Sequence, residues 1–384
     1  MKYLVMLFIA LANPMTGLAT GTLDTLNNII YNEDYPILDG MEMMCKLDIF
    51  IPDKDDERNV IPVFLIHGCA YTVWYDKGSM EPICQYLRHK GYTVFNIEYE
   101  GRGFLPLGLR KKGYKATQSI AAAIKYVLTM SDEFAINPDQ ATLIGVSAGG
   151  ISSLFLGLYD ELNDQEYSLF KDLEDQFGGI YSNSPFISTE VKPAAVVSIG
   201  SALPSLDIID FTDLEETSFL MIHGEEDEMV SIDEDTPFGA IGDSFNEGLR
   251  RFRSNYSNRN RTELTEALVD LFEPDKLAED LIIPDIFGSR AIVNRMVSIN
   301  PEAVDSLFLN NEDHSMLFGE RRNIPKRAFI NIMEKIDVFI QESTLKYRKR
   351  FTAGDFILHP TTRVVATSII GLGLVILFIK ALIL

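Results

Sequence analysis

Cysteine, histidine and positive charge are all scarce in this chain of 384 residues. The three cysteines, Cys45, Cys69 and Cys84, cannot all pair with one another, and none stands in a C-x-x-C spacing. This argues against a disulfide scaffold and against a cysteine-rich zinc site. Lysine and arginine number 34 against 56 acidic residues, which leaves a formal net charge of −22. Such a surface repels phosphate backbones and excludes nucleic-acid binding as a main function.

The overall composition is that of a globular protein. Apolar residues make up 46% of the chain and charged residues 23%, and no internal repeat is visible. These proportions exclude wholesale disorder and a polytopic membrane protein. The length suits one large α/β domain or two smaller ones.

The first residues are typical of a secretory signal. Lys2 is followed by an apolar run from Tyr3 to Ala12, which is too short to span a bilayer but fits the apolar region of a signal peptide. We therefore expect residues 1–19 to be a signal peptide and the protein to be exported. The alternative is a buried N-terminal strand or helix.

The last residues, 364–384, form an apolar run interrupted mainly by Lys380. The run is long enough to cross a membrane, so we expect it to bind one. A single-pass helix after a cleaved signal would leave the basic residues of 346–363 on the exported side, against the positive-inside tendency. A lipid-anchor signal, with small residues at 352–354, a spacer and an apolar tail, avoids that conflict. The choice between helix and lipid anchor stays open.

Between these ends, in residues 20–345, predicted strands alternate with predicted helices. This order indicates an α/β fold with a mainly parallel central sheet flanked by helices. Strands are expected at Met41–Ile51, Val60–Ile66, Tyr92–Ile97, Ala141–Gly145, Ala194–Ile199, Ser218–Ile222 and Ser306–Leu309. Helices are expected at Ser79–His89, with Ser79 as N-cap and Gly91 ending it, and at Ala116–Met130, Ala148–Leu158 and Ile324–Ile340.

Two stretches interrupt this alternation. Residues 160–192 are acidic and rich in turns, and residues 233–301 are mixed, with helical pieces at 243–252 and 262–272. Insertions after sheet strands often form lids over a binding site. We expect 233–301 to be a cap; a lid and a plain surface loop are equally compatible with 160–192.

A G-x-S-x-G motif, Gly145 to Gly149, lies between a predicted strand and a predicted helix. This is the context of a nucleophile elbow, a turn so tight that both glycines must lack side chains and the serine hydroxyl is lifted clear of the sheet. The following helix directs its N–H groups towards negative charge that develops there. Ser147 is therefore a candidate nucleophile.

A serine nucleophile needs a base and a carboxylate that orients the base. Downstream strands end in His223-Gly-Glu-Glu-Asp227 and in Asn-Asn-Glu-Asp-His314, so both loops fall on the same rim of the sheet as Ser147. The residues alone do not separate Asp227 from Glu225 and Glu226 as the acid.

The chain has five histidines, which allows the base to be chosen by elimination. His67 and His223 each precede a glycine at a strand end, where a histidine usually orders its own loop. His89 stands beside Arg88 and Lys90 on a predicted helix, and His359 falls in the spacer before the apolar tail. His314 remains as the expected base.

The segment Ile66-His67-Gly68-Cys69-Ala70 follows a buried strand. Its small residues allow backbone N–H groups to approach a substrate oxyanion. Stabilisation of that oxyanion is often the largest single catalytic effect. The alternative is a simple tight turn.

Together these motifs resemble the α/β-hydrolase superfamily, in the carboxylesterase/lipase branch with an H-G-G-[GA] loop, near feruloyl-esterase-like enzymes. The resemblance runs from about Met41 to Ile340 and includes Gly178-Gly179. It implies the α/β-hydrolase fold, with Ser147 as nucleophile, His314 as general base and Asp227 as orienting acid. It also implies an oxyanion hole lined by backbone N–H groups of Cys69, Ala70 and Ala148. Cys69 departs from the glycine usual in the family.

We therefore predict a membrane-anchored, extracytoplasmic serine esterase that acts on a small or lipid-like ester, with no metal and no organic cofactor. One alternative is a catalytically inactive binding or adhesion protein on the same fold. Another is an intracellular, tail-anchored hydrolase whose residues 1–19 stay uncleaved.

Overall fold

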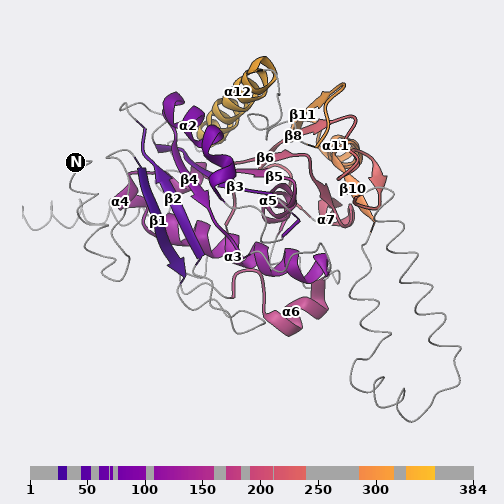
Figure 1. Ribbon diagram of the computed structural model, residues 1–384, viewed down its shortest axis with the longest axis horizontal. Helices are drawn as coiled ribbons and strands as arrows, with labels where there is room; N and C mark the ends of the chain where they lie inside the picture. Colours follow the sequence, from indigo (N-terminus) through magenta and orange to yellow (C-terminus); the bar gives the residue numbers. More distant parts are fainter. Residues whose placement is uncertain are drawn as a thin grey trace, which may run out of the picture. The chain divides into compact units, whose positions relative to one another are not determined.

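The structure is a computed structural model. It describes residues 25–32, 45–52, 60–68, 70–71, 77–100, 108–159, 170–182, 191–210, 212–238, 285–314 and 326–350. The chain divides into two compact units, Met1–Ile340 and Gln341–Leu384. The first unit contains a central sheet with helices on both faces (Figure 1).

An eight-stranded sheet has the order β1-β2-β4-β3-β5-β6-β8-β11. From β4 to β11 all neighbouring strands are parallel, whereas β1 pairs antiparallel with β2, and β2 with β4. The mainly parallel sheet expected from the sequence is thus confirmed. The strands are β1 (Thr25–Asn32), β2 (Cys45–Phe50), β3 (Pro62–Ile66), β4 (Thr93–Ile97), β5 (Thr142–Val146), β6 (Ala195–Ile199), β8 (Ser218–Gly224) and β11 (Val304–Leu309).

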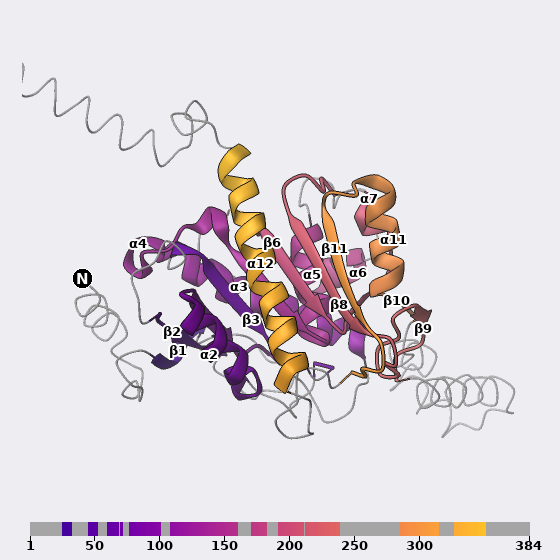
Figure 2. The same cartoon turned by 90° about the horizontal axis from the view of Figure 1, so that it is seen from above.

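Helices cover the sheet from two sides (Figures 1 and 2). One layer contains α3 (Leu109–Thr129) and α5 (Ala148–Leu158), and α5 packs on β5 and β6. The opposite layer contains α2 (Glu81–Lys90) and α12 (Lys326–Arg350), whose residues up to Ile340 share one hydrophobic cluster with the strands. The sheet is therefore buried on both faces, which explains the continuous apolar runs of its central strands.

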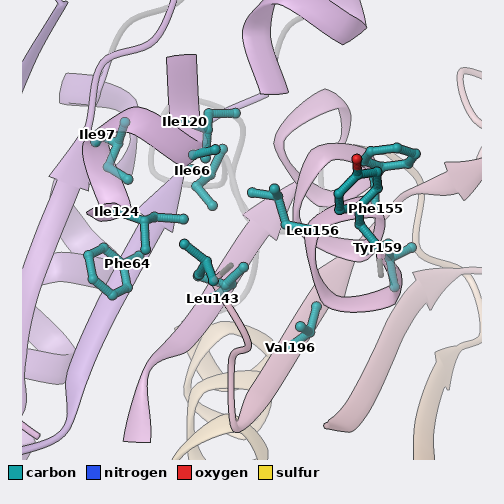
Figure 3. Packing of buried hydrophobic residues seen from close by; sticks show 14 of the residues in the cluster. Phe64, Ile66, Ile97, Ile120, Ile124, Leu143, Phe155, Leu156, Tyr159 and Val196 are labelled. Carbon is teal, nitrogen blue, oxygen red and sulfur yellow. The ribbon is translucent and has the colours of Figure 1, made fainter. Parts of the chain in front are cut away.

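Strand β3 illustrates how one strand contributes side chains to the hydrophobic clusters on both faces of the sheet. All five of its residues are buried. Phe64 and Ile66 pack into the cluster beneath α3 and α5 (Figure 3), whereas Val63 and Leu65 pack into the cluster beneath α2 and α12. Successive side chains point to opposite faces of a strand, so a run without polar residues is what a doubly covered sheet requires.

Helix boundaries differ from the expected ones for α2, α3 and α12, the last of which continues to Arg350 instead of ending at Ile340. A 3₁₀ turn, η2 (Lys77–Met80), precedes α2, whose N-cap is Met80, so the expected N-cap Ser79 was wrong. Gly91 ends α2 in a left-handed conformation with φ 105°, as expected. Helix α3 begins at Leu109, about two turns before the expected start.

The interrupted stretches also contain regular structure. Helix α6 (Lys171–Phe177) lies within 160–192. At the end of the range expected to form the cap, β10 (Ile286–Gly288) and α11 (Ser289–Ile299) are regular elements, and α11 packs against β8 and β11 of the main sheet. The two helical pieces expected at 243–252 and 262–272 lie outside the described residues.

Several short elements of the first unit are described beside the main sheet. Strand β10 pairs antiparallel with β7 (Ala202–Leu203) and with β9 (Glu234–Asp235) in a separate three-stranded sheet. The residues that the structure describes also contain α4 (Ser131–Phe134), η3 (Pro138–Gln140) and α7 (Asp207–Asp210).

The described part of the second unit is the end of α12, residues 341–350, where the Thr344 hydroxyl donates to the Gln341 carbonyl. Among the residues that the structure describes, none of the helices combines the length and the hydropathy that crossing a bilayer requires. Residues 1–19 and 364–384, the expected signal and membrane segments, lie outside that part of the chain.

Candidate active site

Ser147 forms the turn between β5 and α5. Its backbone has φ 54° and ψ −121°, a conformation that non-glycine residues rarely adopt and that costs about 1–3 kcal/mol. The Ser147 N–H donates to the Ile199 carbonyl at 2.8 Å, which ties the turn to β6. The residue is buried, with 7% of its surface exposed.

Close packing explains the two glycines of the motif. A Cβ atom at Gly145 would lie 2.2 Å from the Gly149 carbonyl oxygen, and one at Gly149 would lie 2.3 Å from the Ile66 carbonyl oxygen. Both distances are far below van der Waals contact, and both obstacles are backbone atoms. The backbone of β5, the turn and the end of β3 therefore meet only because both positions lack side chains.

Replacing Gly145 with alanine should therefore lower the free energy of unfolding by roughly 3 kcal/mol. Urea denaturation followed by circular dichroism measures the change. Gly179→Ala is the matched control, because a Cβ there would have its nearest neighbour, Glu174 Oε1, at an ordinary 3.4 Å. Equal stability of the two variants would contradict this reading of the turn.

The structure brings Ser147, His314 and Asp227 together. The Ser147 hydroxyl lies 2.9 Å from His314 Nε2, and His314 Nδ1 lies 2.7 Å from Asp227 Oδ2. Nδ1–H donates to the carboxylate, which leaves Nε2 to accept the hydroxyl hydrogen. The three residues follow β5, β8 and β11, parallel strands whose carboxyl ends share one edge of the sheet.

The carboxylate of Asp227 is held in a fixed geometry. Its Oδ1 accepts hydrogen bonds from the backbone N–H groups of Met229 and Val230, both at 2.9 Å. Burial raises the pKa of Asp227, but hydrogen bonds from His223 and His314, the charge of His314 and the Val230 N–H together lower it to about 2. Asp227 therefore stays ionised over the whole range in which an imidazole titrates.

Contacts separate Asp227 from the two acidic residues before it. Glu225 is exposed and pairs with Arg290 at 3.0 Å, and Glu226 is also exposed. The Asp227 side chain is fully buried and bonded to His314. The structure thus brings to the imidazole the carboxylate that the family resemblance implied and that the residues alone left open.

The segment after β3 lies directly against the serine turn. A Cβ at Gly68 would be 3.0 Å from Ser147 Cβ, and Ala70 has a left-handed φ of 49°. The Tyr71 hydroxyl donates to the Ala148 carbonyl at 2.9 Å, which ties this segment to the first turn of α5. Ala70 and Ala148, two of the three expected oxyanion donors, therefore belong to segments that adjoin Ser147; Cys69, the third, lies outside the described residues.

The other described histidines have different surroundings. His67 is buried, stacks on Tyr99 at 4.3 Å and contacts the Gly68 carbonyl, in agreement with a role in its own loop. His89 is exposed on α2. His359 lies outside the described residues.

Sequence reasoning missed one residue that contacts the carboxylate–imidazole pair and one glycine that adjoins it. His223 Nε2 lies 3.2 Å from Asp227 Oδ2. A Cβ at Gly200, which has φ 57°, would be 3.5 Å from both Asp227 Oδ2 and His314 Nδ1. The position of Gly200 directly after a buried strand, at the rim that carries the other loops, is the signal that could have indicated it.

Cys45 and Cys84 are free and buried. Burial raises the pKa of both thiols, which keeps them protonated and unreactive. In the described part of the chain, no group of three or more His, Cys, Asp or Glu side chains is arranged to hold a metal ion.

Comparison with known proteins supports an α/β-hydrolase fold and similarity to esterases. The BD-FAE family model matches residues 47–202. Venom carboxylesterase-6 of Apis mellifera is 27% identical over 134 residues, a match that spans 34% of this chain and 23% of the bee protein. The chain therefore corresponds to less than a quarter of that relative's length.

Solved structures of esterases share the fold. Esterase 2 of Thermogutta terrifontis, phosphorylated by paraoxon, superimposes with a TM-score of 0.51 at 12% identity, over 85% of this chain and 97% of the esterase. A bifunctional GH43-CE protein of Bacteroides eggerthii gives a TM-score of 0.50 at 14% identity, over 83% of this chain and 35% of that one. The resemblance inferred from the sequence is confirmed: the chain has the α/β-hydrolase fold, and it is similar to feruloyl-esterase-like hydrolases over residues 47–202.

Proposed function

We propose that the protein is a serine carboxylesterase in which Ser147 is the nucleophile, His314 the general base and Asp227 the residue that orients the base. The observation that carries this proposal is the unbroken series from the Ser147 hydroxyl through His314 to Asp227, at 2.9 and 2.7 Å. A hydroxyl in hydrogen-bonding contact with an imidazole that a buried carboxylate orients is an activated nucleophile.

The first half of the reaction forms an acyl-enzyme. Ser147 Oγ attacks the ester carbonyl carbon while its proton passes to His314 Nε2, and the carbonyl oxygen becomes an oxyanion. The imidazolium then gives the proton to the alkoxy oxygen, the bond from carbon to that oxygen breaks, and the alcohol leaves. Asp227, already ionised, stabilises the imidazolium between these two transfers.

The second half returns the free enzyme. A water molecule attacks the acyl carbon and gives its proton to His314, and the bond to Ser147 Oγ breaks as His314 returns the proton to that oxygen. A carboxylic acid is released. Every proton transfer passes through the same imidazole, so His314 serves both halves of the reaction.

Backbone N–H groups stabilise the oxyanion in both halves. Ala148 opens α5, and no side chain caps the first N–H groups of that helix, so they remain available to negative charge. Ala70 and Cys69 would supply the other donors from the segment that packs against the serine turn. A donor of this kind is worth about 3 kcal/mol in the transition state.

Hydrolysis of p-nitrophenyl esters of increasing acyl length, with the matching p-nitroanilides as controls, tests the proposed reaction. A Thermogutta terrifontis esterase with the same fold has been solved with propionate and with butyrate bound, so short acyl groups are the first to assay. We expect ester turnover with little anilide cleavage. Folded protein that hydrolyses none of the esters and takes up no fluorophosphonate would instead favour the binding-protein alternative.

We further propose that the enzyme is exported and anchored in a membrane, with the catalytic domain on the extracytoplasmic side. The apolar segments at 1–19 and 364–384 support this. Sequencing the N-terminus of the natural protein tests export: a start near residue 20 is expected, whereas an intact Met1 would support the tail-anchored alternative. Mass spectrometry of the C-terminal peptide separates a helix that ends at Leu384 from a lipid attached near 352–354.

A further inference from the structure

Asp227 Oδ2 is in contact with two imidazoles. One belongs to His314, at 2.7 Å, and the other to His223, at 3.2 Å. His223 is the last residue but one of β8 and is completely buried. His223 therefore contacts Asp227 Oδ2, the same carboxylate oxygen that contacts His314.

The hydrogen on His223 Nε2 can be assigned from its neighbours. Nε2 faces the Val230 carbonyl oxygen at 2.9 Å and Asp227 Oδ2 at 3.2 Å. A carbonyl and a carboxylate only accept hydrogen bonds, so Nε2 carries the hydrogen and shares it between them. On the other side of the ring, Nδ1 forms a 2.7 Å hydrogen bond with the Ser289 hydroxyl of α11, and both ring nitrogens are thus fixed.

This arrangement closes the loop that carries Asp227. His223 at its start bonds to Val230 at its end, and Asp227 Oδ1 accepts the N–H groups of Met229 and Val230 within it. The Ser289 hydroxyl donates its single hydrogen to His223 Nδ1, and its oxygen also lies 3.2 Å from the Ser201 carbonyl oxygen, at the strand end beside the site.

In the described part of the chain, charged groups lie near His223 on its own loop, at the end of β11 and on α11. Asp227 reaches it from its own loop, and His314 reaches the same carboxylate from the end of β11. From α11, Arg290 pairs with Glu225 and Asp233 at 3.0 and 2.8 Å. Glu226 and Glu228 of the loop are exposed.

We propose that His223 is a positioning residue for the reaction: its Nε2–H holds Asp227 Oδ2 in place for His314 and draws off part of the negative charge that Oδ2 presents to His314. The inference rests on the proposed function. Removing this N–H has two consequences. The carboxylate becomes freer to move, which lowers kcat, and it becomes a stronger partner for the protonated base, which favours imidazolium at higher pH.

Two amide substitutions separate positioning from structure. The side-chain amide of His223→Asn occupies the place of Nδ1 and retains the contact with Ser289, but it is too short to reach Asp227. The longer amide of His223→Gln reaches the place of Nε2 and can donate to Oδ2. His89→Asn, on the exposed face of α2, is the matched control.

The assay is the pH profile of kcat and of kcat/KM on p-nitrophenyl butyrate, with melting temperatures recorded for every variant. For His223→Asn we expect kcat to fall by about 10- to 100-fold, with a smaller effect on KM, and the acidic limb of the kcat/KM profile to move to higher pH. His223→Gln should recover most of kcat and the original profile, and His89→Asn should match the parent chain.

A lowered melting temperature in His223→Asn with kcat and the pH profile unchanged would overturn the proposal, since a purely structural histidine predicts that result. Should His223→Asn fail to fold, Ser289→Ala can be tested instead, because it removes only the hydrogen bond at His223 Nδ1. The proposal expects Ser289→Ala to lower kcat and to move the acidic limb in the same direction, and an unchanged profile would refute it. Absence of turnover by the parent chain itself would count against the proposed function instead.

Discussion

Replacing Ser147 with alanine is expected to lower kcat for ester hydrolysis by about 10⁴- to 10⁶-fold. In the proposed reaction the hydroxyl forms the bond to the substrate carbon, so its loss removes that covalent route. Residual catalysis would come from the oxyanion donors and from substrate binding. Initial rates with p-nitrophenyl butyrate, measured at several enzyme concentrations, give the ratio.

A loss of kcat in Ser147→Ala identifies the nucleophile only if the variant is as stable as the parent chain. Alanine at a position with φ 54° keeps the strain of the turn and loses only the hydroxyl, so the melting temperature should change little. Ser298→Ala, an exposed serine near the end of α11, is the matched control and should retain full activity. Turnover by Ser147→Ala at a rate similar to that of the control would exclude Ser147 as nucleophile.

Replacing Asp227 with asparagine is expected to lower kcat by about 10⁴-fold. The amide is nearly the same shape, but it can donate to His314 Nδ1 and so stabilises the tautomer that has its hydrogen on Nε2. That hydrogen occupies the site that must accept the Ser147 proton. The negative charge that stabilises the imidazolium is lost as well.

The neighbouring acidic residue provides the control. Glu226→Gln makes the same chemical change one position earlier, on an exposed side chain, and should leave kcat within about twofold. Similar losses in the two variants would indicate that the charge of the whole loop, rather than one oriented carboxylate, supports activity.

Hydrophobic patterning predicted the elements that lie under both layers of helices. Residues 60–66 and 194–199 were expected to form strands, because strands that are buried on both faces of a sheet contain few polar residues. The observed β3 and β6 fall within those ranges. Helix α5 was expected at Ala148–Leu158 and occupies those residues, because the serine motif defines its start. The loops that carry Asp227 and His314 were found because each follows an apolar run.

Elements at the edge of the fold could not be predicted in the same way. Strand β1 contains consecutive asparagines, one of them, Asn28, with φ 58°, and its pairing with β2 is irregular. Such an edge strand carries little hydrophobic signal. Helix α11 falls within 233–301, which was expected to form a cap because insertions after sheet strands often do. Its apolar face, with Ile292 and Met296 buried, becomes recognisable only against β8 and β11.

Part of the site also depended on tertiary contacts. His223 precedes a glycine at the end of a strand, and this local pattern indicated only a residue that orders its own loop. Its contact with Asp227 depends on how the loop folds back from Val230. The same folding separates Asp227 from Glu225 and Glu226, which are chemically equivalent to it in the sequence.

Treating the native protein with a fluorophosphonate, and then identifying the modified residue by peptide mass spectrometry, shows directly whether Ser147 is the activated serine. Because only an activated serine reacts rapidly with this reagent, we predict a single adduct on Ser147, greatly slowed in Asp227→Asn and absent from Ser147→Ala. An adduct on a different serine, or ester turnover that continues in protein whose Ser147 is fully modified, would contradict the account.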